Sequence, residues 1–236
     1  MEFSDDSTEF LKYLLPKFKD FYDDESTFNS VKHITPIYSD LVSGDKYYKK
    51  IKKEIDIKFI EKSNIIDTDS INSSKYSQTV KEYIQKKRTG QISFRFNILK
   101  RDITVYFTLF NDEDVNSIPI YSKNIRPIII WLFMCNKYTT SECSNTLKVF
   151  FYLTPFPKIL PKNKNNIISY EHVNTGMTYR CVPNNEIFIY RQEEWFKVFI
   201  HESFHSYGLD IDQSDTNTLK DIVKEIFPIK STFNIA

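Results

Sequence analysis

The sequence predicts an α+β fold in which a small mixed or antiparallel sheet packs on a helix near the C-terminus, with further helices at the N-terminus. Residues 91–99 and 102–110 alternate polar and apolar side chains, as half-buried strands do, and the short link between them predicts an antiparallel hairpin. Residues 191–207 contain neither Gly nor Pro and repeat apolar residues at helical spacing. With 236 residues, 41% of them hydrophobic, the chain can bury a sizeable core.

The N-terminal part is more polar and harder to interpret. Residues 7–22 carry apolar residues at helical spacing, interrupted by Pro16, and predict one or two short helices. Residues 23–77 mix Ser, Asp and Asn clusters with short apolar pieces, which indicates loops with one helix or strand. We therefore divide the chain into an N-terminal helical or irregular region, residues 1–77, and a main domain, residues 78–236.

Apolar spacing and the positions of Gly and Pro predict the remaining elements of the main domain. These are helices at residues 78–88 and 124–138, and strands at residues 147–153 and 186–190. Gly90 is expected to end the first helix, and Pro127 to open the second. The strand at residues 147–153 is expected beside the hairpin, and the last strand leads into the C-terminal helix.

Charge and hydropathy exclude several classes of protein. Lys and Arg total 32 against 31 Asp and Glu, so the balance of charge favours neither nucleic acid nor an anionic membrane as a partner. The longest apolar run, residues 128–135, is far shorter than the roughly 20 residues that span a bilayer. The acidic N-terminus is not followed by the apolar segment of a secretory signal. We expect a soluble, cytoplasmic protein that is not secreted.

The cysteines predict neither a disulfide framework nor a zinc ribbon. Cys135, Cys143 and Cys181 are odd in number, and their spacing does not match the paired pattern of zinc ribbons. We expect all three to be reduced and structural.

The candidate metal ligands and the candidate catalytic residue lie in one segment, His201-Glu202-Ser203-Phe204-His205. Positions i and i+4 of a helix project from one face, so His201 and His205 can present two imidazole nitrogens to one Zn²⁺ ion at about 2.0 to 2.1 Å. Glu202 is the expected general base, since it can take a proton from a zinc-bound water, and it is not expected to be a ligand. The alternative is an amphipathic core helix whose histidines only pack.

The residues around this motif agree with a helix. The apolar stripe expected to be buried, with both histidines facing away from it, consists of Phe196, Ile200, Phe204 and Tyr207. Gly208 supplies a helix stop. Glu193 and Glu194 are expected in the first turn, where they complement the helix dipole.

The motif resembles that of the zincin metallopeptidases. Residues 201–210 are similar to the first part of the metzincin pattern HExxHxxGxxH, but Ile211 stands where that branch has its third ligand. The gluzincin branch, which includes thermolysin, takes a Glu from a later helix, and Glu225 lies at a comparable distance in the sequence. The third ligand is therefore open between Glu225, Asp212, Asp210 and a residue beyond the end of this chain.

The C-terminal third, residues 173–202 in particular, is also similar to uncharacterised metallopeptidases predicted in large, AT-rich DNA viruses. That resemblance implies no substrate. It implies a location in the host cytoplasm or the virion, and a ligand Glu that lies beyond residue 236.

These resemblances imply one Zn²⁺ ion and hydrolysis of a peptide or protein substrate by a zinc-bound water that Glu202 activates. They also imply that the sheet edge above the helix pairs with an extended substrate, and that His172 is a candidate transition-state donor. The alternative is a catalytically inactive zinc-binding or structural protein, for example a virion component, that retains the helix.

Overall fold

The computed structural model describes residues 29–68, 77–111, 113–140, 142–161 and 167–210, with residues 12 and 163 standing alone. Its elements in chain order are α2 (Asn29–Ile51), β1 (Asp56–Glu61), η2 (Lys62–Asn64), α3 (Gln78–Lys87), β2 (Arg88–Ile98), β3 (Arg101–Phe110), η3 (Val115–Ser117), α4 (Ile118–Tyr138), β4 (Thr146–Thr154), α5 (Tyr170–Val173), β5 (Gly176–Thr178), β6 (Asn184–Arg191) and α6 (Trp195–Ser206). The helices expected within residues 7–22 lie outside the described ranges.

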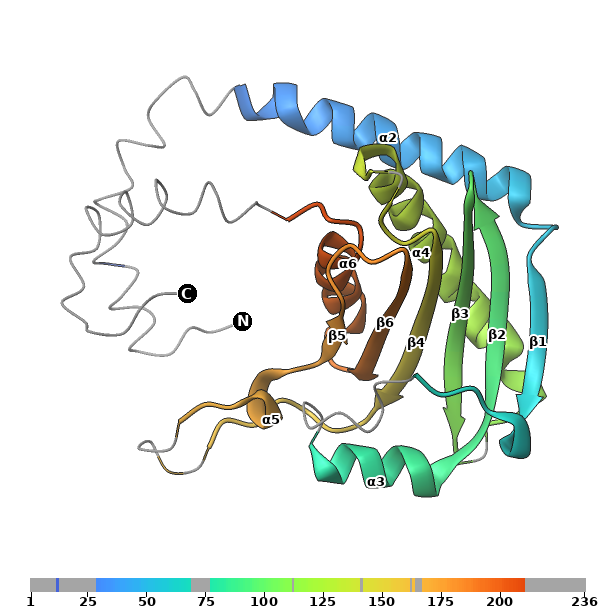
Figure 1. The fold of residues 1–236 in the computed structure, drawn as a ribbon, viewed down its shortest axis with the longest axis vertical. Helices are drawn as coiled ribbons and strands as arrows, with labels where there is room; N and C mark the ends of the chain where they lie inside the picture. Colours follow the sequence, from blue (N-terminus) through green and yellow to red (C-terminus); the bar gives the residue numbers. More distant parts are fainter. Residues whose placement is uncertain are drawn as a thin grey trace.

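The strands form one mixed sheet of six, in the order β1-β2-β3-β4-β6-β5 (Figure 1). Strands β3, β4 and β6 run parallel to one another, whereas β1, β2 and β5 pair antiparallel with their neighbours. The predicted α+β class, the β2-β3 hairpin and the two later strands are confirmed. Because β1 pairs with β2, the sheet takes residues from both sides of the boundary predicted at residue 77.

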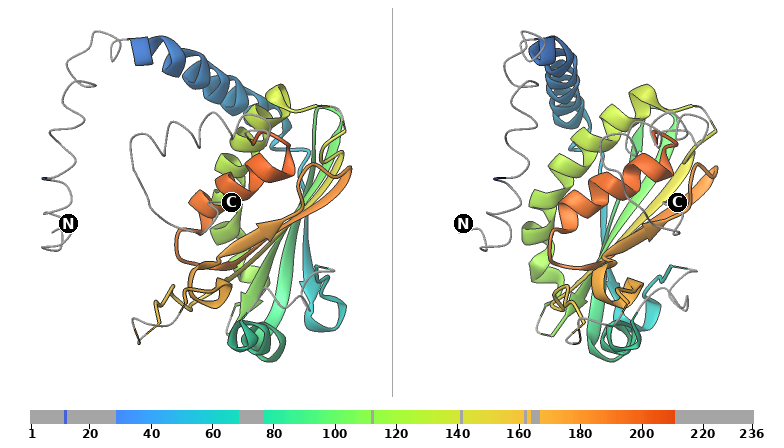
Figure 2. Two further views of the ribbon diagram at one scale, coloured as in Figure 1. Left: turned by 60° about the vertical axis from the view of Figure 1, so that its left-hand side comes forward. Right: turned by 90° about the vertical axis from the view of Figure 1, so that its left-hand side faces the viewer.

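Helices α4 and α6 lie side by side on one face of the sheet (Figure 2). Side chains from this face, including Phe107 and Phe151, form the larger core cluster with Leu132 of α4 and Phe199 of α6. Alternate residues of the same strands point the other way, where they pack against Val80 and Ile84 of α3. The motif helix is thus held against a fully formed apolar face.

The sequence predicted one helix or strand somewhere in residues 23–77 but did not locate the long helix α2, because two of the positions that it buries are not apolar. Its buried residues include Asp40 and Gly44. Asp40 accepts hydrogen bonds from Lys137 and Tyr138 at the end of α4. A Cβ on Gly44 would lie 3.0 Å from the carbonyl oxygen of Ile130, so the two helices approach closely at this glycine. A helix with such contacts leaves little hydrophobic periodicity in its sequence.

Two predicted helix boundaries are wrong. Gly90 does not end α3, because the chain passes directly from Lys87 into β2, and Gly90 lies in that strand where its register with β3 shifts. Pro127 does not open α4 but lies inside it. The start of α4 is nine residues earlier, next to Pro119, since proline is accepted in the first turn of a helix.

The prediction of three reduced cysteines is also wrong, because Cys143 and Cys181 form a disulfide across 38 residues of sequence. Cys143 precedes β4 and Cys181 precedes β6, and these strands are parallel neighbours, so the segments that lead into them lie side by side. That adjacency is not visible in the cysteine spacing. Cys135 is a free, buried thiol, and burial raises its pKa.

Within the described ranges, no helix is both long enough and apolar enough to cross a membrane.

Candidate metal centre

The motif helix α6 starts later than the sequence indicates. It begins at Trp195, so Glu193 and Glu194 precede it instead of occupying its first turn. Glu194 adopts a left-handed conformation with φ of 53°, and its carboxylate pairs with Lys158 and Lys197. The glutamates therefore shape the entry into the helix and do not act on its dipole from inside the first turn.

The predicted buried stripe is confirmed at Tyr207, which is fully buried, and is wrong at Phe204. Phe199, Ser203 and Ser206 are fully buried, whereas Phe204 is 40% exposed and only touches Trp131 at its edge of the helix. Apolar residues occur on more than one face of α6, so periodicity alone does not choose between them. The small serines allow the helix to approach the sheet closely. His201 is exposed and the side chain of His205 is 41% exposed, so both histidines do face away from the core.

The two histidines converge at one point. Their Nε2 atoms are 3.1 Å apart, and their rings lie at 85° with centroids 4.7 Å apart. Two nitrogens that bind one tetrahedral Zn²⁺ ion at 2.0 to 2.1 Å are about 3.3 Å apart. The pair therefore fits a shared ion with little adjustment.

Asp210 forms a hydrogen bond with the Nδ1 atom of His205, on the side of the ring away from Nε2. The Nδ1 of His205 donates a hydrogen bond to Oδ2 of Asp210 at 2.7 Å, and Nε of Arg180 lies 3.5 Å from the same oxygen. A carboxylate that accepts from Nδ1–H leaves the lone pair of a neutral imidazole on Nε2, where a metal binds. Asp210 thus lies on the Nδ1 side of the ring, away from Nε2, and is not placed as a third ligand beside the two Nε2 atoms.

The end of α6 brings Asp210 to this position. Gly208 has φ of 63°, and its amide donates to the carbonyl of His205 at 3.1 Å. The amide of Leu209 donates to the carbonyl of Phe204 at 2.8 Å, which completes a Schellman cap. Gly208 is therefore the helix stop that the sequence predicts, and the reversal at this glycine returns the chain toward His205.

Glu202 lies on the inner side of the histidine pair. It is 9% exposed, and desolvation raises its pKa to about 7, with a smaller lowering by His205 and a smaller raising by Asp210. A carboxyl group with a pKa in this range can exchange protons at neutral pH, as a general base must.

The other predicted site residues are more distant or lie outside the described ranges. His172 of α5 uses its Nδ1 locally, 2.9 Å from both the amide and the hydroxyl of Ser169, and makes no hydrogen bond to the motif residues. Asp212 and Glu225 are not among the described residues. In the part of the chain that is described, no group of three or more His, Cys, Asp or Glu side chains is placed to hold a metal ion.

We expect Asp210→Asn to weaken zinc binding by about 10- to 100-fold, because loss of a carboxylate behind a metal-binding imidazole typically has that effect. Competition with a chromophoric chelator measures the change. Asp102→Asn is the matched control, since Asp102 pairs with Arg95 on an exposed part of the hairpin. Equal zinc affinity in the two variants would contradict the role assigned to Asp210.

Sequence reasoning missed two residues of the turn between β5 and β6: Arg180, which pairs with Asp210, and Cys181, whose amide donates to the carbonyl of His205. The pairing of β5 with β6 and the disulfide to Cys143 bring that turn to the end of α6, and no local sequence pattern predicts either of them. Comparisons with protein-family models, with curated proteins and with solved structures found no match to this chain.

Proposed function

We propose that this protein is a zinc-dependent peptidase of the zincin type, which hydrolyses peptide bonds with Glu202 as general base. The observation that carries the proposal is the arrangement on α6: two Nε2 atoms 3.1 Å apart on the outer face, beside a buried Glu202 whose pKa is raised to about 7. A helix whose histidines had only a packing role would not need to bring both Nε2 atoms together beside a buried carboxyl group.

Each residue has a defined task in the proposed reaction. His201 and His205 would hold the ion through Nε2, and Asp210 keeps His205 in the tautomer that leaves Nε2 free to bind it. A zinc ion bound by these histidines would supply Lewis acidity, which polarises a carbonyl group and lowers the pKa of water. Glu202 accepts the proton of the attacking water and then delivers it to the departing amine.

The edge of the sheet supports a peptide as substrate. Strand β5 pairs with β6 on one side and ends the described sheet, and it lies beside α6 (Figure 1). Edge strands bind extended peptides by adding a strand through main-chain hydrogen bonds. Zincins, which this motif resembles, use the strand above the active-site helix in this way.

The second candidate is a zinc-binding or structural protein without catalytic activity. The observation that favours it is that the described residues supply two metal ligands, His201 and His205, where catalytic zinc sites use three protein ligands. Asp212 and Glu225 remain the candidates for a third ligand within the chain.

Metal content tests the tightly bound zinc that the peptidase requires, and the activity of the zinc-loaded protein then separates a peptidase from an inactive zinc-binding protein. We expect purified protein to retain one zinc per chain after dialysis against a mild chelator, and the His201→Ala/His205→Ala variant to retain none. His172→Ala is the matched control and should keep the ion, because His172 contacts Ser169 and not the motif. A wild-type protein that loses its zinc under these conditions would favour the second candidate, since two histidines alone bind zinc weakly.

A further inference from the structure

We infer that the Cys143–Cys181 disulfide positions the metal-binding end of α6, so that the zinc affinity of the site depends on whether this cysteine pair is oxidised. The inference rests on the proposed function, because it assumes that His201 and His205 bind zinc. It adds a positioning element that lies outside the HExxH motif.

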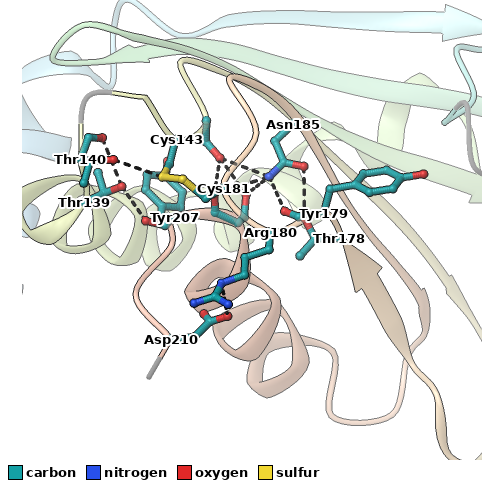
Figure 3. Close-up of a disulfide and its surroundings, with 12 residues drawn as sticks. Thr139, Thr140, Cys143, Thr178, Tyr179, Arg180, Cys181, Asn185, Tyr207 and Asp210 are labelled. Atoms are coloured by element: carbon teal, nitrogen blue, oxygen red, sulfur yellow. Dashed lines mark hydrogen bonds and ion pairs between the residues drawn. A yellow bond between two sulfur atoms is a disulfide. The ribbon is translucent and has the colours of Figure 1, made fainter. Parts of the chain in front are cut away.

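The turn that carries Cys181 makes one contact with His205 and one with Asp210, and Figure 3 shows Arg180 of this turn beside Asp210. The amide of Cys181 donates a hydrogen bond to the carbonyl oxygen of His205 at 3.1 Å. The neighbouring Arg180 lies with Nε 3.5 Å from Oδ2 of Asp210, the oxygen that accepts from the His205 ring. Both the backbone and the imidazole of the second ligand therefore depend on where residues 180 and 181 are held.

The other half of the disulfide is a fixed anchor. The carbonyl of Cys143 accepts from Nε of the buried Arg101 at 3.2 Å, and Arg101 also donates to the carbonyl of Thr140 at 2.6 Å. The next residue, Ser144, is fully buried and donates to the carbonyl of Ser206 at 2.8 Å. The covalent bond thus ties the turn with Cys181 to a segment that the interior already holds.

The disulfide also packs against the cap of α6. A Cβ placed on Gly208 would lie 3.1 Å from Sγ of Cys143 and 3.2 Å from Cβ of Cys181. The reversal that returns Asp210 to His205 therefore passes directly over the two sulfur atoms. Without the S–S bond, the turn that carries Cys181 loses its covalent link to Cys143, and the cap at Gly208 loses the fixed pair of sulfur atoms against which it packs.

The chemistry of the switch is a thiol–disulfide exchange. A dithiol reductant breaks the S–S bond and supplies two electrons and two protons, so that Cys143 and Cys181 become thiols and the dithiol becomes a disulfide. After reduction, hydrogen bonds and the Arg180–Asp210 pair are left to hold the turn against α6. We expect zinc affinity to fall by about tenfold, at the lower end of the effect of losing an outer-shell partner.

The test compares the oxidised full-length protein with its Cys143→Ser/Cys181→Ser variant, in which no new thiols are available to bind the metal. Zinc dissociation constants are measured by chelator competition, after titration of free thiols has verified the disulfide in the wild type. Ile84→Ala is the matched control for stability, because Ile84 is fully buried on α3, in the core cluster on the opposite face of the sheet. Urea unfolding of the zinc-free proteins shows how far each variant is destabilised.

The inference predicts about tenfold weaker zinc binding in the double-serine variant and unchanged binding in Ile84→Ala at a comparable loss of stability. Equal affinity in the wild type and the double-serine variant overturns the inference and leaves the proposed function intact. A parallel loss of affinity in Ile84→Ala also overturns it, because the effect would then follow general stability. An oxidised wild type that binds no zinc overturns the proposed function, and the inference with it.

Discussion

Glu202→Gln is expected to lower peptidase turnover by about 10²- to 10⁴-fold while zinc remains bound, because the amide keeps the shape of the side chain but cannot accept a proton. Glu202 is not placed as a ligand: the ion would lie between Nε2 of His201 and Nε2 of His205. Turnover of a quenched-fluorescence peptide library and metal content, measured on the same preparations, separate the two effects.

The matched control for this substitution is Glu193→Gln, since Glu193 is exposed and precedes α6. Its activity and zinc content should equal those of the wild type. Because Glu202 is buried, circular dichroism must show that Glu202→Gln keeps its fold. Undiminished turnover in a folded, zinc-loaded Glu202→Gln protein would remove Glu202 from the mechanism.

Phe199→Ala is expected to lower the free energy of unfolding by about 3 to 5 kcal/mol, the usual range for deletion of a fully buried phenylalanine ring. Phe199 is inaccessible to solvent, and its ring centroid lies 5.6 Å from that of Phe151 and 6.0 Å from that of Phe196. The ring is therefore a main contact by which α6 packs against the sheet. Urea unfolding followed by fluorescence gives the change.

Phe204→Ala provides the comparison, because the sequence places Phe204 in the buried stripe while the structure leaves it 40% exposed. The smaller burial and the aromatic contact with Trp131 predict a loss of about 1 to 2 kcal/mol. A larger loss for Phe204→Ala than for Phe199→Ala would show that α6 is rotated from the orientation described.

Local patterns were sufficient for the elements that bury alternate or helically spaced apolar residues. The hairpin of β2 and β3, the strands β4 and β6, and the motif helix were all predicted within a few residues of their ends. Local patterns did not locate α2, whose buried positions include Asp40 and Gly44, because a salt bridge and a close helix crossing leave no apolar repeat in the sequence. Strand order was also beyond reach, since it depends on contacts between distant segments.

The candidate site divides in the same way. His201, Glu202 and His205 share one helical turn, so their spacing alone predicts how they meet. Asp210 was considered only as a ligand out of register, because nothing in the sequence shows that the chain reverses far enough to place its carboxylate behind the His205 ring. The Cys143–Cys181 disulfide depends on the parallel pairing of β4 with β6 and was predicted to be absent.

The Schellman cap of α6 has a consequence for how this chain can vary. The cap returns Asp210 to His205 through hydrogen bonds of fixed sequence spacing, and a residue inserted into or removed from the cap would disrupt them. Insertions and deletions between residues 205 and 210 should therefore be excluded from any functional descendant. Fewer sequences will match the ten-residue pattern His-Glu-x-x-His-x-x-Gly-x-Asp than the five-residue motif. We expect chains that share the longer pattern to share the carboxylate that accepts from Nδ1 of the second histidine.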